Sequence, residues 1–297
     1  MVKKADGPGS VTGGVVFSAA VAAFVLLNVI FSVIVLATGL PQDSEAYIYI
    51  SYLVAPAAVA ISVPIALKFR RTPFKGLIPI KMEAKAGAKW CAVAVLLAFG
   101  LLFSLSWINV GFAALLESWG YEDTSAYFPD LSGGRVVLAL LVMAVIPALF
   151  EESLFRGVIL GNIRGEAGEL NSVFLTGMCF ALFHASAVQT LYQFICGCVF
   201  ALLALRARSL VPCMLAHFLN NAAIIILEAC GLNTSGTLFD WAPLWAAVLI
   251  TILSALAFIA GMVILIREKR PLAAGVKGGV KYFFLAAGVG ILVLAVL

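Results

Sequence analysis

Charged residues are scarce in this chain of 297 residues, at 11% of the sequence, whereas 63% of its residues are hydrophobic. A soluble domain carries about 25% charged residues. The mean hydropathy of +1.11 and the lack of a polar block long enough to build a soluble domain predict a polytopic membrane protein. The net charge of +4 is spread over short loops, which argues against the concentrated basic face of a nucleic-acid-binding protein.

Several familiar site motifs are missing as well. The six cysteines fall mostly inside apolar runs, where they act as small hydrophobic residues. Cys196-Gly-Cys198 lacks the spacing of a zinc or redox motif, and no disulfide framework is implied. The sequence contains no H-E-x-x-H, no G-x-S-x-G and no glycine-rich phosphate loop. Any chemistry must therefore use other residues.

Long apolar runs dominate the sequence. A transmembrane helix needs about 20 mostly apolar residues, and the candidate spans are 15–40, 46–67, 90–116, 136–160, 172–188, 190–205, 209–227, 242–266 and 282–297. We expect an all-α fold, a polytopic transmembrane helical bundle of about eight or nine spans that encloses a polar intramembrane cavity. We divide it into N-terminal helices with a basic cytoplasmic loop (1–135), a catalytic core (136–227) and C-terminal helices (228–297).

The basic residues set the predicted orientation, because they favour cytoplasmic loops. With nine spans and a cytoplasmic N-terminus, 17 of the 19 basic residues lie inside. Fusing 172–188 with 190–205 would place the basic cluster at 267–281 outside, so we expect a hairpin that turns near Ala187–Thr190. The chain is thus predicted to be a multi-pass integral protein of a bacterial or archaeal-type cell membrane.

Only three charged residues fall inside the predicted spans, namely Glu151, Glu152 and Arg156. A charge near the bilayer centre costs about 2.5–3.5 kcal/mol on insertion scales, so such residues are functional candidates. Glu152 and Arg156 are four residues apart and share a helix face, which predicts an ion pair. Glu151 is turned about 100° away. We interpret Glu152 with Arg156 as an internally neutralised pair and Glu151 as the working carboxylate.

The two histidines of the chain, His184 and His217, also fall inside predicted spans. Phe180 lies four residues before His184 and can orient its ring, while Asn221 lies four residues after His217 on the same helix face. Peptide hydrolysis needs a base, a proton donor for the leaving amine and donors for the oxyanion. Glu151 can be the base with His184 holding the same water, and His217 and Asn221 can donate to the oxyanion.

Other interpretations stay open on the residues alone. The charged cluster can be a structural polar lock between helices, and the chain can be a non-proteolytic membrane scaffold. A proton-coupled transporter could use Glu151 and the histidines as a relay. The absence of repeated halves and of paired broken helices argues against that transporter.

The three motifs, Glu151-Glu152-x-x-x-Arg156, Phe180-x-x-x-His184 and His217-x-x-x-Asn221, occur in an order that resembles the CAAX protease and bacteriocin-processing (Abi) family. The resemblance covers residues 136–225 and implies an intramembrane endopeptidase whose helices enclose a conical cavity. Its implied partners are the lipid bilayer and a peptide or protein substrate, prenylated or not, that reaches the site from the membrane. Family members also include bacteriocin-immunity proteins and scaffolds, so a non-proteolytic role is the alternative.

The resemblance also raises the question of a metal cofactor, because the family is often labelled metalloprotease. If zinc is present, its ligands would be Glu151, His184 and His217. We favour a mechanism with no metal and no other cofactor, because asparagine is a poor zinc ligand and Arg156 disfavours a nearby cation.

Overall fold

The computed structural model describes residues 9–77, 79–121, 128–232, 234, 236–268 and 278–296. The chain is 81% helical, and its described residues form no strand. The elements in chain order are α1 (Gly9–Thr38), α2 (Glu45–Phe69), α3 (Ala84–Gly100), η1 (Leu101–Leu105), α4 (Trp107–Ser118), α5 (Arg135–Ala139), η2 (Leu140–Val145), α6 (Ile146–Glu152), η3 (Ser153–Ile159), α7 (Leu160–Ala167), α8 (Glu169–Phe183), α9 (Thr190–Ala207), α10 (Val211–Ala229), η4 (Leu238–Asp240), α11 (Leu244–Arg267) and α12 (Gly279–Val296). The segments η1, η2 and η3 are π-helical, and η4 is a 3₁₀ turn.

The predicted all-α membrane bundle is confirmed. Seven helical stretches of the described chain are long and apolar enough to cross a membrane. Two of them are composite, because π-helical segments join α3 to α4 over Ala84–Ser118 and α5 to α7 over Arg135–Ala167. The shorter apolar helices Glu169–Phe183 and Gly279–Leu294 occupy the other two predicted spans. The predicted hairpin is present, since α8 and α9 are separate helices that pack against each other.

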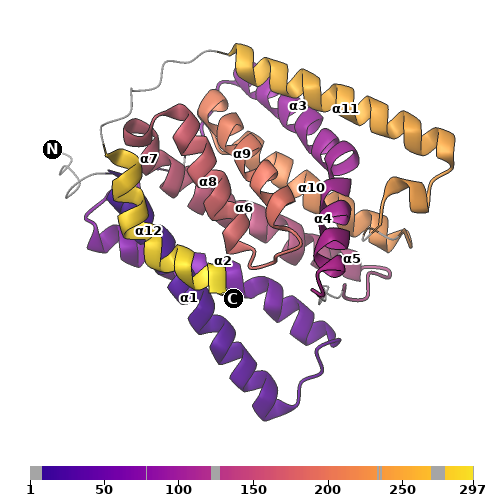
Figure 1. The fold of residues 1–297 in the computed structure, drawn as a ribbon, viewed down its shortest axis with the longest axis horizontal. Helices are drawn as coiled ribbons and strands as arrows, with labels where there is room; N and C mark the ends of the chain where they lie inside the picture. The colour runs from indigo at the N-terminus through magenta and orange to yellow at the C-terminus, as the bar shows by residue number, and fades with distance from the viewer. Residues whose placement is uncertain are drawn as a thin grey trace.

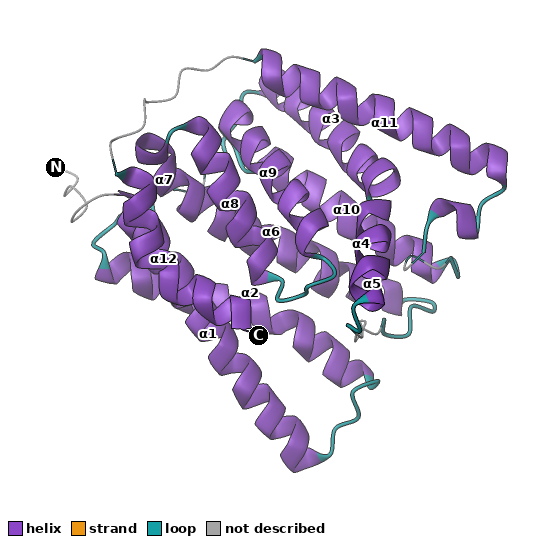
Figure 2. Cartoon of the chain, viewed as in Figure 1, coloured by secondary structure: helices purple, strands orange, loops and turns teal. Residues whose placement is uncertain are grey.

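The helices that carry the three motifs lie in the middle of the bundle. In Figure 1, α6, α8, α9 and α10 are flanked on one side by α1, α2 and α12 and on the other by α3 and α11. The first helix packs along α12 and α2, and α3 packs along α11 and α10 (Figure 2). Helices from both ends of the sequence therefore enclose the central motifs, while the predicted division into three parts stays a prediction.

Buried ion pairs and helix caps fix the ends of these helices. The Glu166 carboxylate accepts from the backbone N–H groups of Gly9 and Ser10, at 2.6 and 2.9 Å. It thereby places a negative charge at the N-terminus of α1, which suits the helix dipole. Glu169 at the start of α8 pairs with both Arg206 guanidinium nitrogens of α9, at 2.7 and 2.6 Å. Arg206 Nε also donates to the Leu265 carbonyl of α11, so three helices are joined at one point.

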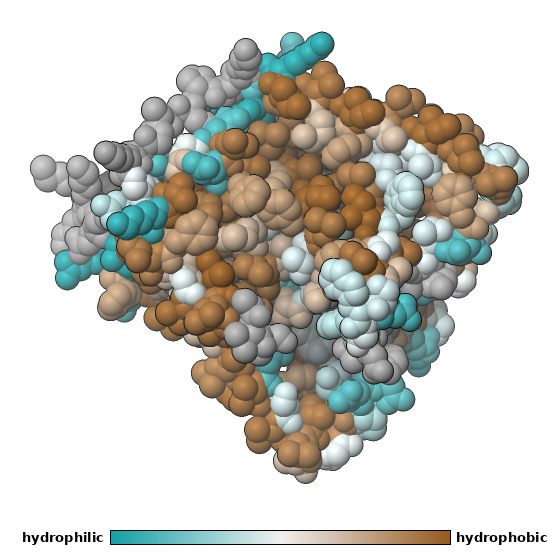
Figure 3. All heavy atoms as spheres, viewed as in Figure 1, coloured by the Kyte–Doolittle hydropathy of each residue, from teal (hydrophilic) through white to brown (hydrophobic). Residues whose placement is uncertain are grey.

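The molecular surface is apolar to an extent that suits a membrane. Figure 3 shows hydrophobic residues over most of the visible face, with polar residues gathered near loops and helix ends. Large apolar side chains are exposed on the outer helices, for example Leu36 (86%) on α1 and Val289 (73%) on α12. Such contiguous apolar surface needs lipid around it, because soluble monomers rarely expose patches of this size.

The predicted cytoplasmic N-terminus depends on basic residues that the structure leaves undescribed. Lys3, Lys4, Lys269, Arg270 and Lys277 all lie outside the described residues. The orientation of the bundle therefore stays a prediction, whereas its nature as a multi-pass membrane protein follows from the apolar helices.

Candidate active site

The stretch Glu151–Arg156 lies where an α-helical segment changes to a π-helical one. The two glutamates end α6, and η3 begins at Ser153 and contains Arg156. A second π-helical segment, η2, ends just before Pro147. The π-helix is rare and often marks functional sites. These two irregularities bracket the glutamates and set the direction of their side chains.

Glu152 is the centre of a fully buried polar network. Arg156 Nη1 donates to Glu152 Oε1 at 2.8 Å, and both side chains have 0% exposure. His217 Nδ1 lies 2.9 Å from the same oxygen. Because the carboxylate can only accept, the ring nitrogen donates, which fixes His217 with its Nδ1 protonated and its Nε2 as the remaining nitrogen. The predicted Glu152–Arg156 pair is confirmed, and the sequence did not indicate that His217 would join it.

Besides its ion pair with Glu152, Arg156 is surrounded by aromatic rings and a backbone carbonyl. Its guanidinium carbon lies 4.4 Å from the centroid of the Phe180 ring and 5.3 Å from that of Phe200. Its Nη2 donates to the Gly197 carbonyl of α9 at 3.1 Å. Cation–π contacts of this kind are worth about 2 kcal/mol or more when desolvated. The arginine is therefore stabilised inside the bundle without contact with water.

Gly177 of α8 and Gly197 of α9 allow the backbones of these two helices to approach closely. A Cβ atom on Gly197 would lie 2.7 Å from the Cα of Gly177, and one on Gly177 would lie 3.0 Å from the backbone nitrogen of Cys198. Helix backbones approach closely in membranes where small residues meet. Any larger residue at Gly177 or Gly197 would separate α8 from α9 and move the carbonyl that binds Arg156.

His184 is placed by the end of α8. It is the first residue after the helix, and Ala185 next to it has a positive φ of 47°. The His184 Nδ1 lies 2.8 Å from the Phe180 carbonyl, and the two rings lie edge to face with centroids 4.7 Å apart. Since a carbonyl only accepts, Nδ1 carries the proton and Nε2 is the free acceptor. His184 thus lies at a helix end, where the sequence predicted a residue within the span.

Glu151 faces His184. Its Oε2 lies 3.9 Å from His184 Nε2, a distance too long for a hydrogen bond, and that oxygen is buried without a hydrogen-bond partner among the described residues. A buried carboxylate oxygen without a partner is costly. A single water molecule can bridge the two atoms by donating one hydrogen bond to each.

Asn221 reaches the π-helical segment from α10. Its amide nitrogen donates to the Met143 carbonyl at 3.2 Å. Met143 is four residues before Pro147, and proline has no N–H to offer that carbonyl. The asparagine therefore satisfies an acceptor that the proline leaves open, and it retains a second N–H. The adjacent Asn220 accepts instead from the Tyr192 hydroxyl of α9, at 3.3 Å.

The four predicted catalytic residues thus come from three helical stretches. Glu151 faces His184, whereas His217 bonds Glu152 and Asn221 bonds the Met143 carbonyl. Their catalytic roles stay predictions. The sequence analysis missed several residues that hold the site. The small residues at Gly177 and Gly197 could have indicated a close approach of α8 and α9. No feature of the sequence indicated the contacts of Phe200, Tyr192 and Met143.

The predicted zinc ligands do not fit a zinc ion in this arrangement. Zinc in proteins is held by three or four donors at about 2.0–2.3 Å. Among the described residues, no three His, Cys, Asp or Glu side chains converge in that way. The mechanism that we propose for this site therefore contains no step on a metal ion.

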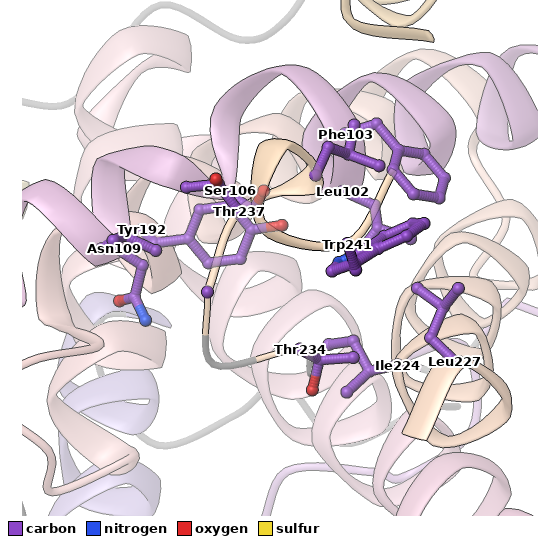
Figure 4. Close-up of a pocket in the computed structure, with 13 residues that line it drawn as sticks. Leu102, Phe103, Ser106, Asn109, Tyr192, Ile224, Leu227, Thr234, Thr237 and Trp241 are labelled. Atoms are coloured by element: carbon purple, nitrogen blue, oxygen red, sulfur yellow. The ribbon is translucent and has the colours of Figure 1, made fainter. Parts of the chain in front are cut away.

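A cavity of about 150 Å³ lies beside the site. Figure 4 shows its lining, to which α10 contributes Ile224 and Leu227 and α9 contributes Tyr192. None of the four predicted catalytic residues lines it. This cavity is therefore not the predicted polar cavity around Glu151, which stays a prediction.

Comparison with known proteins agrees with the motifs. Residues 133–223 match the family model of the type II CAAX prenyl endopeptidase Rce1-like proteins. A protein of Bacillus subtilis (strain 168) named "Putative membrane peptidase YdiL" is 21% identical over 217 residues, which cover 61% of this chain and 88% of that protein. No solved structure matches the chain significantly. The part of the chain that carries the three ordered motifs is therefore similar to the Rce1-like CAAX endopeptidases, and it is set in a bundle of apolar helices.

Proposed function

We propose that the chain is an intramembrane endopeptidase that hydrolyses a peptide bond of a membrane-associated or C-terminal peptide substrate. The observation that carries this proposal is the pairing of Glu151 with His184. The carboxylate oxygen and the ring nitrogen are both acceptors, both face one point, and lie 3.9 Å apart. The match to a family of CAAX endopeptidases supports hydrolysis of peptides as the chemistry.

Glu151 acts as the general base in this mechanism. A water molecule between Glu151 Oε2 and His184 Nε2 donates one hydrogen bond to each, which leaves an oxygen lone pair for attack on the scissile carbonyl carbon. Glu151 takes the proton as the new C–O bond forms. It then returns that proton to the leaving nitrogen as the C–N bond breaks, so the carboxylate is regenerated.

His217 and Asn221 stabilise the oxyanion of the tetrahedral intermediate. His217 is anchored through Nδ1 to Glu152, at 2.9 Å. In its doubly protonated form the ring donates to the oxyanion through Nε2, while Nδ1 stays bonded to Glu152. Asn221 supplies the N–H that Met143 does not take. Because both donors are anchored in advance, little reorganisation is needed during the reaction.

Glu152, Arg156 and Phe180 are positioning residues. Glu152 fixes the ring of His217, and Arg156 neutralises that carboxylate. Phe180 packs on Arg156 through its ring and on His184 through its ring and carbonyl. One phenylalanine therefore links the two halves of the site.

The substrate reaches the site from the membrane in this proposal, because the motif helices lie inside the bundle. Whether the peptide carries a prenyl group is a matter for measurement. The decisive experiment compares membrane peptides by mass spectrometry in cells that contain the wild-type protein, Glu151→Gln or His184→Ala. We expect substrate peptides to accumulate uncleaved with both variants.

The outcome separates the proposal from a scaffold or immunity role. If both variants are present at wild-type levels and cleave as the wild type does, the mechanism is wrong. If neither the wild type nor the variants alter any peptide, and the cellular phenotype survives both substitutions, the chain acts without proteolysis.

A further inference from the structure

We propose that the cavity of Figure 4 is a specificity pocket that receives one uncharged, aromatic or branched apolar side chain of the peptide substrate. This inference rests on the proposed endopeptidase function. It assigns a role to residues outside the catalytic motifs, and it adds a substrate preference that the motifs themselves do not contain.

The lining selects for an uncharged group. Among the described residues, no Asp, Glu, Lys, Arg or His side chain lines the cavity. Phe103, Ile224, Leu227 and Trp241 provide an apolar and aromatic wall (Figure 4). Burying an unpaired charge there would be costly, whereas an apolar side chain gains about 25 cal/mol for each Å² removed from water.

One polar atom in the lining calls for a donor on the ligand. Asn109 Oδ1 is buried and has no hydrogen-bond partner among the described residues. A buried acceptor of this kind costs about 1–3 kcal/mol until it is satisfied. A peptide backbone N–H next to an apolar side chain supplies such a donor. The combination of an apolar wall and an unpaired acceptor therefore fits an amino-acid residue better than a plain hydrocarbon chain.

The size of the cavity limits the ligand to one side chain. Its volume of about 150 Å³ equals that of an engineered core cavity of about 150 Å³ that binds benzene. Pockets for drug-sized ligands measure about 300–1,000 Å³. A phenylalanine or leucine side chain fits, and a long lipid chain does not fit as a whole.

The position of the cavity fits a peptide that runs along α10. His217, Asn221 and Ile224 follow one another at successive turns of this helix, and Ile224 lines the cavity. Seven residues of helix span about 10 Å, and an extended peptide advances about 3.3 Å per residue. The pocket therefore receives the side chain about three residues away from the scissile bond.

The walls of the pocket come mostly from outside the part of the chain that matches the family model. Phe103 and Asn109 precede residues 133–223, and Ile224, Leu227 and Trp241 follow them. Trp241 directly follows η4, whose capping box between Thr237 and Asp240 holds the turn in place. The pocket can thus vary between relatives while the catalytic motifs stay the same, as a specificity determinant should.

The experiment uses purified full-length protein in nanodiscs and a library of peptides randomised over four positions on each side of a cleavable bond. Cleavage sites are read by mass spectrometry for the wild type, for Ile224→Trp, which fills the cavity, and for Ile226→Trp as the matched control. Ile226 lies on the same helix with 49% exposure and does not line the cavity. Ser106→Leu, a second filling variant from another wall, covers the case in which Ile224→Trp fails to fold.

We expect the wild type and Ile226→Trp to favour Phe, Leu or Met at one position about three residues from the cleaved bond. Filling the cavity should lower kcat/KM for peptides with a large residue there by about tenfold or more, and leave peptides with alanine there unchanged. An identical preference in the wild type and both filling variants overturns the pocket while the endopeptidase function stands. If the wild type cleaves no peptide at all, the proposed function fails, and the specificity role fails with it.

Discussion

The two adjacent glutamates, Glu151 and Glu152, occupy opposite environments. The Glu152 side chain has no exposure, and its Oε1 accepts from both Arg156 and His217. Glu151 has a slightly exposed side chain and faces only a histidine, at 3.9 Å. Each carboxylate keeps a buried Oε2 that the described residues do not bond, but only Glu152 is fixed by two partners on its other oxygen. The difference shows how one chain can bury a structural charge and a reactive charge side by side.

The difference arises from the helix itself. Successive residues of a helix point about 100° apart, so the two carboxylates cannot share a partner. Glu152 points towards α9 and α10, which bring the Gly197 carbonyl and His217. Glu151 points towards the end of α8, where the backbone turns at Ala185 and leaves His184 at the helix end.

The largest expected effect concerns Glu151. Replacing Glu151 with glutamine removes the general base but keeps the shape of the side chain. We expect kcat to fall by about 10²–10⁴-fold, with little change in the thermal unfolding midpoint. Initial rates with a cleaved peptide and unfolding in the same detergent measure both effects. Glu117→Gln, an exposed acid at the end of α4, is the control. A wild-type cleavage rate in Glu151→Gln would show that Glu151 is not the reactive carboxylate.

The second effect concerns Arg156, where we expect a loss of stability in addition to a loss of activity. Arg156→Met leaves the Glu152 carboxylate buried beside His217 without its neutralising partner. Breaking a buried ion pair costs about 3–5 kcal/mol in stability, so the unfolding midpoint should fall markedly. Activity should fall with it, because His217 loses its support. Arg164→Met, at an exposed arginine of α7, should change neither quantity. An unaltered midpoint in Arg156→Met would show that the network is not structural.

The third effect compares the neighbouring residues Asn221 and Asn220. Removal of one oxyanion donor costs about 10²–10³-fold in kcat, and we expect that loss for Asn221→Ala with KM little changed. Asn220→Ala breaks only the hydrogen bond to Tyr192 and should reduce kcat less than tenfold. The measurement is steady-state kinetics on one peptide. Equal losses in the two variants would mean that Asn221 acts only by supporting Met143.

Much of the fold could be predicted from the sequence, because apolar length and charge placement are strong signals in membranes. Every predicted span coincides with a helix, and even the short hairpin of α8 and α9 follows from the positions of Arg267 and its neighbours. The three π-helical segments were not predicted. Only η2 ends close to a proline, Pro147, and no residue pattern distinguishes the three segments from an ordinary helix.

The candidate site was predictable in its residues but less so in its contacts. The spacing of four residues predicted the Glu152–Arg156 pair, because both residues lie on one helix. The bond between His217 and Glu152 joins residues 65 positions apart, and no local pattern encodes such a contact. The close approach of Gly177 and Gly197 and the shielding of Arg156 by Phe200 are equally non-local.

The smallest expected effect concerns metal. The pair of Glu151 and His184 acts on water without an ion in our proposal, so purified wild-type protein should contain well under one zinc per chain by mass spectrometry. A chelator should leave peptide cleavage unchanged, because the donors that could bind zinc do not converge among the described residues. His184→Ala is the matched variant, and its zinc content should equal that of the wild type. Stoichiometric zinc in the wild type that is lost in His184→Ala would instead assign Glu151 to a metal centre. The contrast between the two glutamates would then be one between a metal ligand and the carboxylate that positions His217.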